Sequence, residues 1–291
     1  GVFQHLADDG YKVSEIGVDK DGALDMDELE KAIGPDTALV SIMWANNETG
    51  VIFPIERIGQ LCRERGVLFH TDAVQAAGKI AIDLKSLPID MLSISGHKLH
   101  APKGVGALYV RKGTKIKPLI IGGHQENGRR AGTENTASIA GLGKAAELAL
   151  EGLAQENQQV RALRNRLEKG LLANCKDALL NGKNRLPNTL NISFKYIEGE
   201  SILLMLDELG ISASSGSACA SGSLEPSHVL RAMGVPFTAA HGSIRFSLSR
   251  FNTEDEIDFV IAQMPEIVDR LRDISPFIDN ETGEPVELGI S

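Results

Sequence analysis

A lysine and an aspartate that follow two short apolar segments are the residues of this chain best suited to covalent chemistry. Asp72 follows the apolar residues 67–69, and Lys98 follows the apolar residues 91–94. A lysine amine forms a Schiff base with pyridoxal phosphate (PLP), and a carboxylate keeps the ring nitrogen of that cofactor protonated, so that the ring withdraws electrons. Lys98 alone would be interpreted as a surface residue. Its combination with Asp72 predicts a PLP site.

Strands of a parallel sheet must position this pair. Short apolar segments bounded by polar residues and glycine are typical of buried strands. The sequence predicts a helix over residues 24–33, a strand over 38–43, and a second helix that begins at Pro54 and ends at Gly66. Alternating strands and helices indicate βαβ units, and such sheets bind ligands beyond the carboxyl ends of their strands. Both side chains are therefore expected at one edge of the sheet.

Four more polar residues stand close to this pair in the sequence. Asn47 follows the strand over 38–43, Gln75 lies on the expected first turn of the next helix, and Ser95 and His97 come just before the lysine. By itself, Asn47 would indicate an Asx turn, and Gln75 would be an ordinary exposed residue. Hydroxyl and imidazole donors at a turn suit a phosphate group, although His97 could also simply cap its strand.

A metal site is the alternative use of the histidines in this region. His70, Asp72 and His97 include a His-x-Asp pair, which can ligate zinc. No third strong ligand stands at a usual spacing, so no metal site is predicted.

The sequence contains one cysteine in a setting that suits a nucleophile. Cys219 lies in a segment rich in Gly, Ser and Ala, residues 212–223, where a flexible linker would have no use for a thiol. Cys62, in contrast, shares the apolar face of the helix after Pro54 and is expected in the core. Arg245, in a strand expected over 243–249, could bind a carboxylate with two hydrogen bonds, or could lie at the surface.

The second half of the chain is expected to mix helices and strands. A long helical region is predicted from about residue 136 to 172, and a final helix is capped by Thr253 and Glu256 and kinked by Pro265. Residues 275–291 are expected to form a mobile tail. Between the two helical regions the sequence predicts a strand over 189–194, a helix over 199–209 and the strand over 243–249.

Several motifs, in this order along the chain, resemble the cysteine desulfurases of the NifS type, in the class V aminotransferase family. The resemblance covers nearly all 291 residues. It rests on the segments 44–50 (WANNETG), 70–75 (HTDAVQ), 95–98 (SGHK), 129–135 (RRAGTEN) and 215–219 (SGSAC).

This resemblance implies a fold and an activity. The fold is the α/β fold type I of PLP enzymes: a large domain over residues 1–152, with a mainly parallel sheet and helices on both faces, and a smaller α+β domain over 153–291. The implied enzyme is a homodimer that converts L-cysteine to L-alanine. It passes the sulfur as a persulfide on Cys219 to a NifU-like iron–sulfur scaffold protein in nitrogen fixation.

The resemblance also implies roles for single residues. Lys98 and Cys219 are catalytic, and Asn47 and Arg245 bind the substrate carboxylate. Thr133, at the end of the basic and Gly-rich loop over 116–133, reaches the PLP phosphate of the other subunit. The complete set of implied cofactor-binding residues is Lys98, Asp72, Gln75, Asn47, Ser95, His97 and Thr133.

The composition is that of an ordinary globular enzyme. Hydrophobic residues make up 42% and charged residues 24%, and the net charge of −9 argues against nucleic-acid binding. No apolar run reaches the roughly 18 residues that would span a membrane. The three cysteines, Cys62, Cys175 and Cys219, stand far apart, which excludes a disulfide framework and indicates a reducing compartment, taken as the cytoplasm.

The first residues read like the interior of a helix and do not include an initiator methionine. Judged by motif order, the family has about a quarter more chain before this point, with a phosphate loop and a ring-stacking histidine. The chain is therefore expected to lack its N-terminal segment. The alternatives to a desulfurase are a selenocysteine lyase, another fold type I PLP enzyme, and a non-catalytic fragment.

Overall fold

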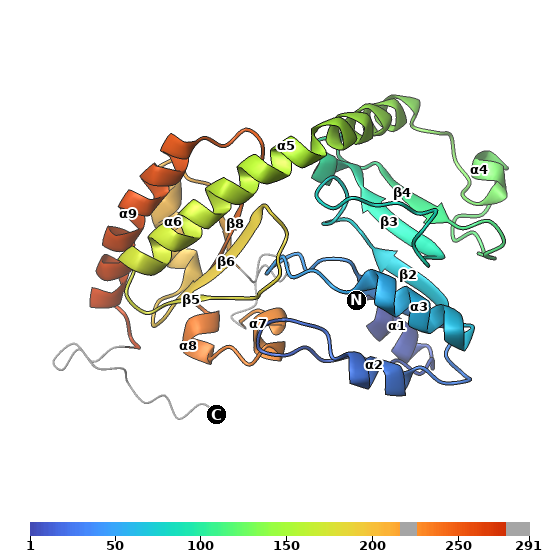
Figure 1. Ribbon diagram of the computed structural model, residues 1–291, viewed down its shortest axis with the longest axis horizontal. Helices are drawn as coiled ribbons and strands as arrows, with labels where there is room; N and C mark the ends of the chain where they lie inside the picture. Colours follow the sequence, from blue (N-terminus) through green and yellow to red (C-terminus); the bar gives the residue numbers. More distant parts are fainter. Residues whose placement is uncertain (216–225, 278–291) are drawn as a thin grey trace.

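A computed structural model describes residues 1–215 and 226–277, and shows two β-sheets linked by one long helix (Figure 1). The first sheet has the strand order β1-β2-β3-β4. Its first three strands are parallel, and the fourth is antiparallel to the third. The mainly parallel sheet expected from the sequence is confirmed. The strands are β1 (Leu39–Met43), β2 (Leu68–Asp72), β3 (Met91–Ser95) and β4 (Gly106–Val110).

Local sequence signals explain where the helices of this half begin and end. Asp25 accepts hydrogen bonds from the N–H groups of Asp27 and Glu28, and so caps α2 (Met26–Ala32). Helix α3 (Ile55–Arg65) follows Pro54 and ends at Gly66, whose φ of 67° is the left-handed conformation that glycine adopts readily. Both helices confirm the sequence prediction.

Helices α2 and α3 cover one face of the first sheet. Ile58 of α3 and Phe69 of β2 are fully buried in the same cluster as Leu29 of α2. Cys62 is also fully buried there, which confirms its expected place in the core, and burial raises the pKa of its thiol to about 11. Because successive side chains of a strand point to opposite faces, every second residue lies on the other face. That other face carries exposed apolar side chains, 38% to 51% accessible, from Leu39, Met43, Leu68 and Leu108.

The second sheet is antiparallel, with the strand order β5-β6-β8-β7. Side chains from three helices pack with β6 and β8 in one cluster, which includes Leu167 of α5, Leu206 of α6 and Met264 of α9. This confirms the α+β character expected for the C-terminal part. The elements are α5 (Thr136–Asn174), β5 (Ala178–Leu180), β6 (Thr189–Phe194), α6 (Gly199–Glu208), β7 (Ser214–Ser215), β8 (Ser243–Ser247) and α9 (Glu254–Asp273).

Helix α5 runs along the top of the molecule in Figure 1 and links the two sheets. It continues without a break through residues 152 and 153, where the sequence analysis divided the chain. Helix α9 begins with the predicted capping box of Thr253 and Glu256, and continues through Pro265. The expected tail lies mostly outside the described residues, which end at Phe277.

One helix expected from the sequence is not formed. Residues 74–79 form consecutive turns, so Gln75 lies in a turn and not in the predicted helix. In the part of the chain that the structure describes, the helices fall short of the length and apolar character that a membrane span requires. The remaining short elements are α1 (Val2–Asp8), η1 (Gly96–Leu99), α4 (Gln125–Gly128), α7 (His228–Ala232) and α8 (Phe237–Ala240).

Candidate active site

The carboxyl ends of β1, β2 and β3 meet at one edge of the first sheet. Asp72, the last residue of β2, is aligned with Met43 of β1 and with Ser93 of β3. Asn47 follows β1, and Lys98 lies in η1 directly after β3. The structure therefore brings Asn47, Asp72 and Lys98 to the same edge, as expected for residues that follow parallel strands.

The carboxylate of Asp72 is exposed at this edge. One of its oxygens, Oδ1, accepts a hydrogen bond of 2.9 Å from the N–H of Val74, and its backbone carbonyl accepts one of 2.8 Å from Trp44. The side chain is thus oriented by an Asx turn while it stays accessible to a ligand. Gln75, half-buried in the following turn, lies beside it in the chain.

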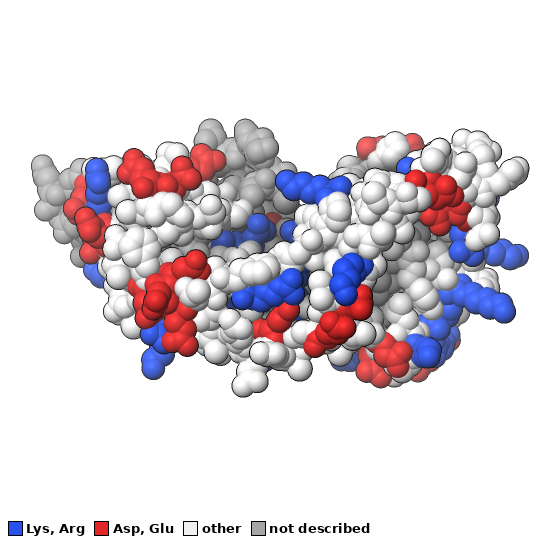
Figure 2. All heavy atoms as spheres, turned by 90° about the horizontal axis from the view of Figure 1, so that it is seen from above, with Lys and Arg blue, Asp and Glu red and all other residues white. Residues whose placement is uncertain are grey.

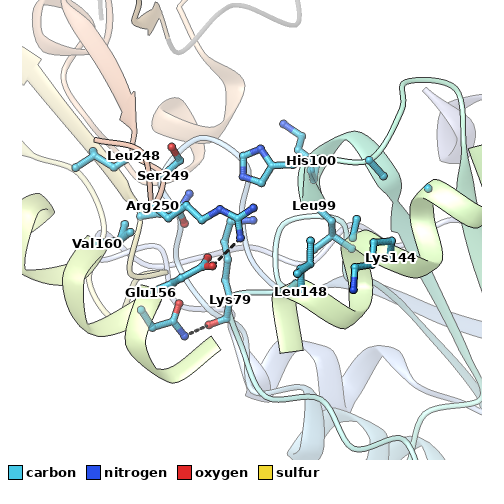
Figure 3. A pocket seen from close by; sticks show the side chains of 18 of the residues that line it. Lys79, Leu99, His100, Lys144, Leu148, Glu156, Val160, Leu248, Ser249 and Arg250 are labelled. Carbon is cyan, nitrogen blue, oxygen red and sulfur yellow. Dashed lines mark hydrogen bonds and ion pairs between the residues drawn. The ribbon is translucent and has the colours of Figure 1, made fainter. Parts of the chain in front are cut away.

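Lys98 is half-buried and lines a pocket of about 330 Å³ between η1, α5 and the residues that follow β8. Figure 3 shows Lys79, His100, Glu156 and Arg250 around this pocket. Arg250 donates to Glu156 at 2.7 Å. Glu156 is the one carboxylate among the described residues that line the pocket, so the lysines that line it have no second carboxylate there. Figure 2 views the molecule from above and shows Lys and Arg side chains, in blue, around the hollow near the centre of this face.

Lys79 is a feature of this pocket that sequence reasoning missed. Burial, together with the positive charge of Lys98, lowers the pKa of Lys79 to about 8. The available signal was its position: the lysine stands between apolar residues in the segment 76–82, AAGKIAI. The pocket that Lys98 lines therefore also contains the amine of Lys79, whose pKa is low.

Ser95 and His97 contact each other directly. The hydroxyl of Ser95 lies 2.8 Å from Nδ1 of His97, and His97 is exposed. The two side chains therefore form one polar group immediately before Lys98. Thr133 does not belong to this group: it is exposed in the segment between α4 and α5.

Arg245 of β8 connects the second sheet to this edge. Its Nη1 donates a hydrogen bond of 2.9 Å to the backbone carbonyl of Asn47. Its Nε is buried and has no hydrogen-bond partner within the described residues. The Asx turn expected here is formed by Asn46, whose Oδ1 accepts from the N–H groups of Glu48 and Thr49, so the Asn47 side chain is not needed for it.

A buried carboxyl group, Glu48, lies in the same turn and was also missed from the sequence. Burial raises the pKa of Glu48, whereas the hydrogen bond from Ser227 and the charges of His228 and Arg245 act in the opposite direction. Glu48 and Ser227 stand 179 residues apart in the chain, so no local pattern pairs them.

Cys219 lies outside the described residues. The structure describes the chain before and after the segment that contains it. Before it, Ser214 of β7 is paired with Arg245 of β8. After it, the hydroxyl of Ser227 donates to Glu48. The chain before the segment thus pairs with the residue that bonds Asn47, and the chain after it bonds the neighbour of Asn47.

Comparisons with known proteins found a matching family model and similar curated proteins. The family model for class-V aminotransferases matches residues 2–260. The chain is 61% identical to "Cysteine desulfurase NifS" of Azotobacter vinelandii over 278 residues, which are 95% of this chain and 69% of that protein. It is also 61% identical to a cysteine desulfurase of Nostoc sp. over 284 residues, 97% of this chain and 71% of the other.

Solved structures give the same result. A NifS-like protein superposes with a TM-score of 0.85 at 41% identity, over 92% of this chain and 71% of that one. A NifS-like protein from Rickettsia africae superposes with a TM-score of 0.84 at 35% identity, over 92% and 72%. These superpositions confirm the fold class expected from the sequence.

Proposed function

Because this chain belongs to the class-V aminotransferase family, among its NifS-type cysteine desulfurases, we propose that it is a PLP-dependent enzyme that converts L-cysteine to L-alanine. The observation that carries the proposal is the meeting of Asp72, Lys98 and the Asn47–Arg245 contact at one edge of the first sheet. An amine, a carboxylate and an arginine are the groups that an amino acid bound to PLP requires.

The residues at this edge fit the cofactor by their chemistry. Lys98 offers a half-buried amine for the covalent linkage, and Asp72 offers an exposed, oriented carboxylate for the ring nitrogen. When bound, PLP supplies a ring that withdraws electrons from the substrate. In the proposal Ser95, His97 and Thr133 bind its phosphate, Thr133 from the other subunit of a homodimer, while Gln75 and Asn47 contact its phenolic oxygen.

Arg245 is proposed to bind the substrate carboxylate together with Asn47. Its Nη1 is already fixed by the Asn47 carbonyl, whereas its buried Nε lacks an acceptor within the described residues. An unsatisfied buried donor costs about 1–3 kcal/mol. A carboxylate that accepts from this guanidinium would recover part of that free energy, and binding would be favoured accordingly.

Cys219 is proposed to take the sulfur. Its thiolate attacks the sulfur atom of the bound cysteine; a sulfur–sulfur bond forms on Cys219 while the carbon–sulfur bond of the substrate breaks. The carbon that loses sulfur takes up a proton, donated by Lys98 or a nearby histidine, and becomes the methyl group of alanine. The persulfide then passes to an acceptor, proposed as a NifU-like iron–sulfur scaffold protein of nitrogen fixation in the cytoplasm.

The domain division at residues 152 and 153 is part of the same proposal. The two hydrophobic clusters support it: one contains β1 to β3, and the other contains β6 and β8. Because α5 continues through the boundary, the two parts would be coupled through a helix and not through a flexible linker.

The purified chain, reconstituted with PLP, tests the proposal directly. With L-cysteine we expect a visible lysine-bound PLP band, stoichiometric alanine, and a persulfide that maps to Cys219 by mass spectrometry. Alanine formed from selenocysteine alone would instead indicate a selenocysteine lyase, and amino transfer to a keto acid would indicate an aminotransferase. A chain that binds no PLP would contradict the proposal for this polypeptide.

A further inference from the structure

A row of three hydrogen-bonded side chains crosses β1, β2 and β3. Nδ1 of His70 lies 2.8 Å from the hydroxyl of Ser41, and Nε2 of His70 lies 2.9 Å from the hydroxyl of Ser93. Both nitrogens of the half-buried imidazole are therefore engaged, each with a different neighbouring strand. Since a hydroxyl can donate or accept, a neutral imidazole satisfies one serine as a donor and the other as an acceptor.

This row lies directly behind Asp72. His70 and Asp72 are two residues apart on β2, so their side chains share one face of the sheet. Ser93, which holds one side of the imidazole, is also the residue of β3 aligned with Asp72. The same serine therefore joins the row to the strand that leads into Lys98.

The charge of Asp72 acts on the imidazole of His70. Burial lowers the pKa of His70, and the Asp72 carboxylate is the charge that opposes this effect. The neighbours from β1 and β3, Ser41 and Ser93, do not ionise near neutral pH, so within the described residues Asp72 is the group whose charge acts on the imidazole. Removal of the Asp72 charge should therefore lower the pKa of His70 further.

We propose that His70 is a positioning residue for Asp72: held between Ser41 and Ser93, the imidazole ties the end of β2 to β1 and β3, and so fixes the place of the carboxylate that would face the ring nitrogen of the cofactor. This inference rests on the proposed function for the role of Asp72, but the coupling between the two side chains exists without any cofactor. His70 touches neither substrate nor cofactor in this scheme and acts through Asp72 alone.

The first test measures the coupling in the cofactor-free chain. NMR titration of the His70 ring in the parent and in Asp72→Asn should show a pKa that falls by roughly half a unit when the carboxylate charge is removed. Asp83→Asn is the matched control, because Asp83 also accepts from the N–H two residues ahead, at 3.0 Å, but lies away from the row. An unchanged His70 pKa in Asp72→Asn, or an equal fall in Asp83→Asn, would overturn the proposal.

The second test measures the consequence for PLP. His70→Leu removes both hydrogen bonds and should weaken PLP binding about five- to tenfold and shift the pH at which the lysine-bound PLP band changes. His70→Gln, whose amide can donate and accept, should restore affinity. Arg111→Leu is a stability control, since Arg111 donates to the carbonyls of Leu84, Leu87 and Ile89. It should lower the melting temperature without moving the band.

The outcomes separate this proposal from the proposed function. A parent chain that binds no PLP contradicts the proposed function. The NMR titration of His70 in the parent and in Asp72→Asn then tests the positioning proposal without the cofactor. If PLP binds and the band titrates identically in the parent and in His70→Leu, the imidazole is only structural and the proposal fails.

Discussion

Nη1 of Arg245 donates a 2.9 Å hydrogen bond to the backbone carbonyl of Asn47, across 198 residues of sequence. This contact joins β8 of the second sheet to the turn that follows β1 of the first. The guanidinium is therefore oriented before any substrate arrives, because one of its nitrogens is fixed by the main chain. Preorganisation of this kind lowers the entropy that binding would otherwise lose.

Replacing Arg245 by Gln should weaken cysteine binding more than it slows the chemical step. The amide cannot form the charged, bidentate contact with a carboxylate, so KM should rise at least about tenfold while kcat falls less. Steady-state assays of alanine formation measure both constants. Arg166→Gln is the control, since Arg166 pairs with Asp258 at the surface. Equal KM values for the parent and Arg245→Gln would remove Arg245 from the site.

Lys98→Ala should lose the PLP adduct that borohydride reduces and that survives denaturation. Lys98 and Lys79 line the same pocket, and the low pKa of Lys79, about 8, makes it a plausible nucleophile in its own right. Peptide mass mapping after reduction distinguishes the two amines. We expect the adduct on Lys98 in the parent and in Lys79→Met. An adduct that moves to or starts on Lys79 would contradict the assignment.

Cys219→Ala should retain PLP and lose the persulfide, because cofactor binding depends on Lys98 and sulfur transfer depends on the thiol. The two other cysteines are the controls: Cys62 and Cys175 are buried, and burial raises the pKa of each thiol to about 11. Few thiolates exist at such sites near neutral pH. A cysteine pulse followed by alkylation and mass mapping should therefore find the persulfide on Cys219. Its appearance on Cys62 or Cys175 would refute the mechanism.

The stability of the protein should increase between pH 8 and pH 10, in part because of Lys79. Its pKa in the folded chain is about 8, below the ordinary value of 10.5, so the unfolded chain binds the extra proton across this window. Stability rises with pH wherever the unfolded state holds more protons. Urea denaturation at several pH values measures the slope. Lys79→Met should flatten it, whereas Lys144→Met, at an exposed lysine of the same pocket, should leave it unchanged.

The sequence predicts features of this structure that depend on neighbours in the chain. The glycine after α3 and the capping box of α9 are local patterns, and both appear where they are predicted. The strand β6 has the predicted bounds, residues 189–194. The edge that carries Asp72 and Lys98 also follows from local order, because parallel strands end on the same side.

Features that depend on distant or competing contacts escaped prediction. The segment after Asp72 reads as a helix, but the Asx turn of Asp72 and the left-handed Gly78, at φ 72°, favour consecutive turns. Glu48 accepts from Ser227, the residue that caps α7, and the two residues are brought together only by the tertiary fold. The low pKa of Lys79 likewise depends on burial by residues far along the chain. Local periodicity contains none of this information.

Because of the exposed apolar side chains on the face of the first sheet opposite α3, the association state of this polypeptide should depend on its concentration. This face presents Leu39, Met43 and Leu68 on the adjacent strands β1 and β2 and Leu108 on β4, and β1 and β4 are the outermost strands of this sheet as described. Apolar patches and free strand edges of this kind promote self-association. Preparations should therefore scatter more light as they are concentrated, and a covering polypeptide or a charged substitution at Leu68 should reverse that trend.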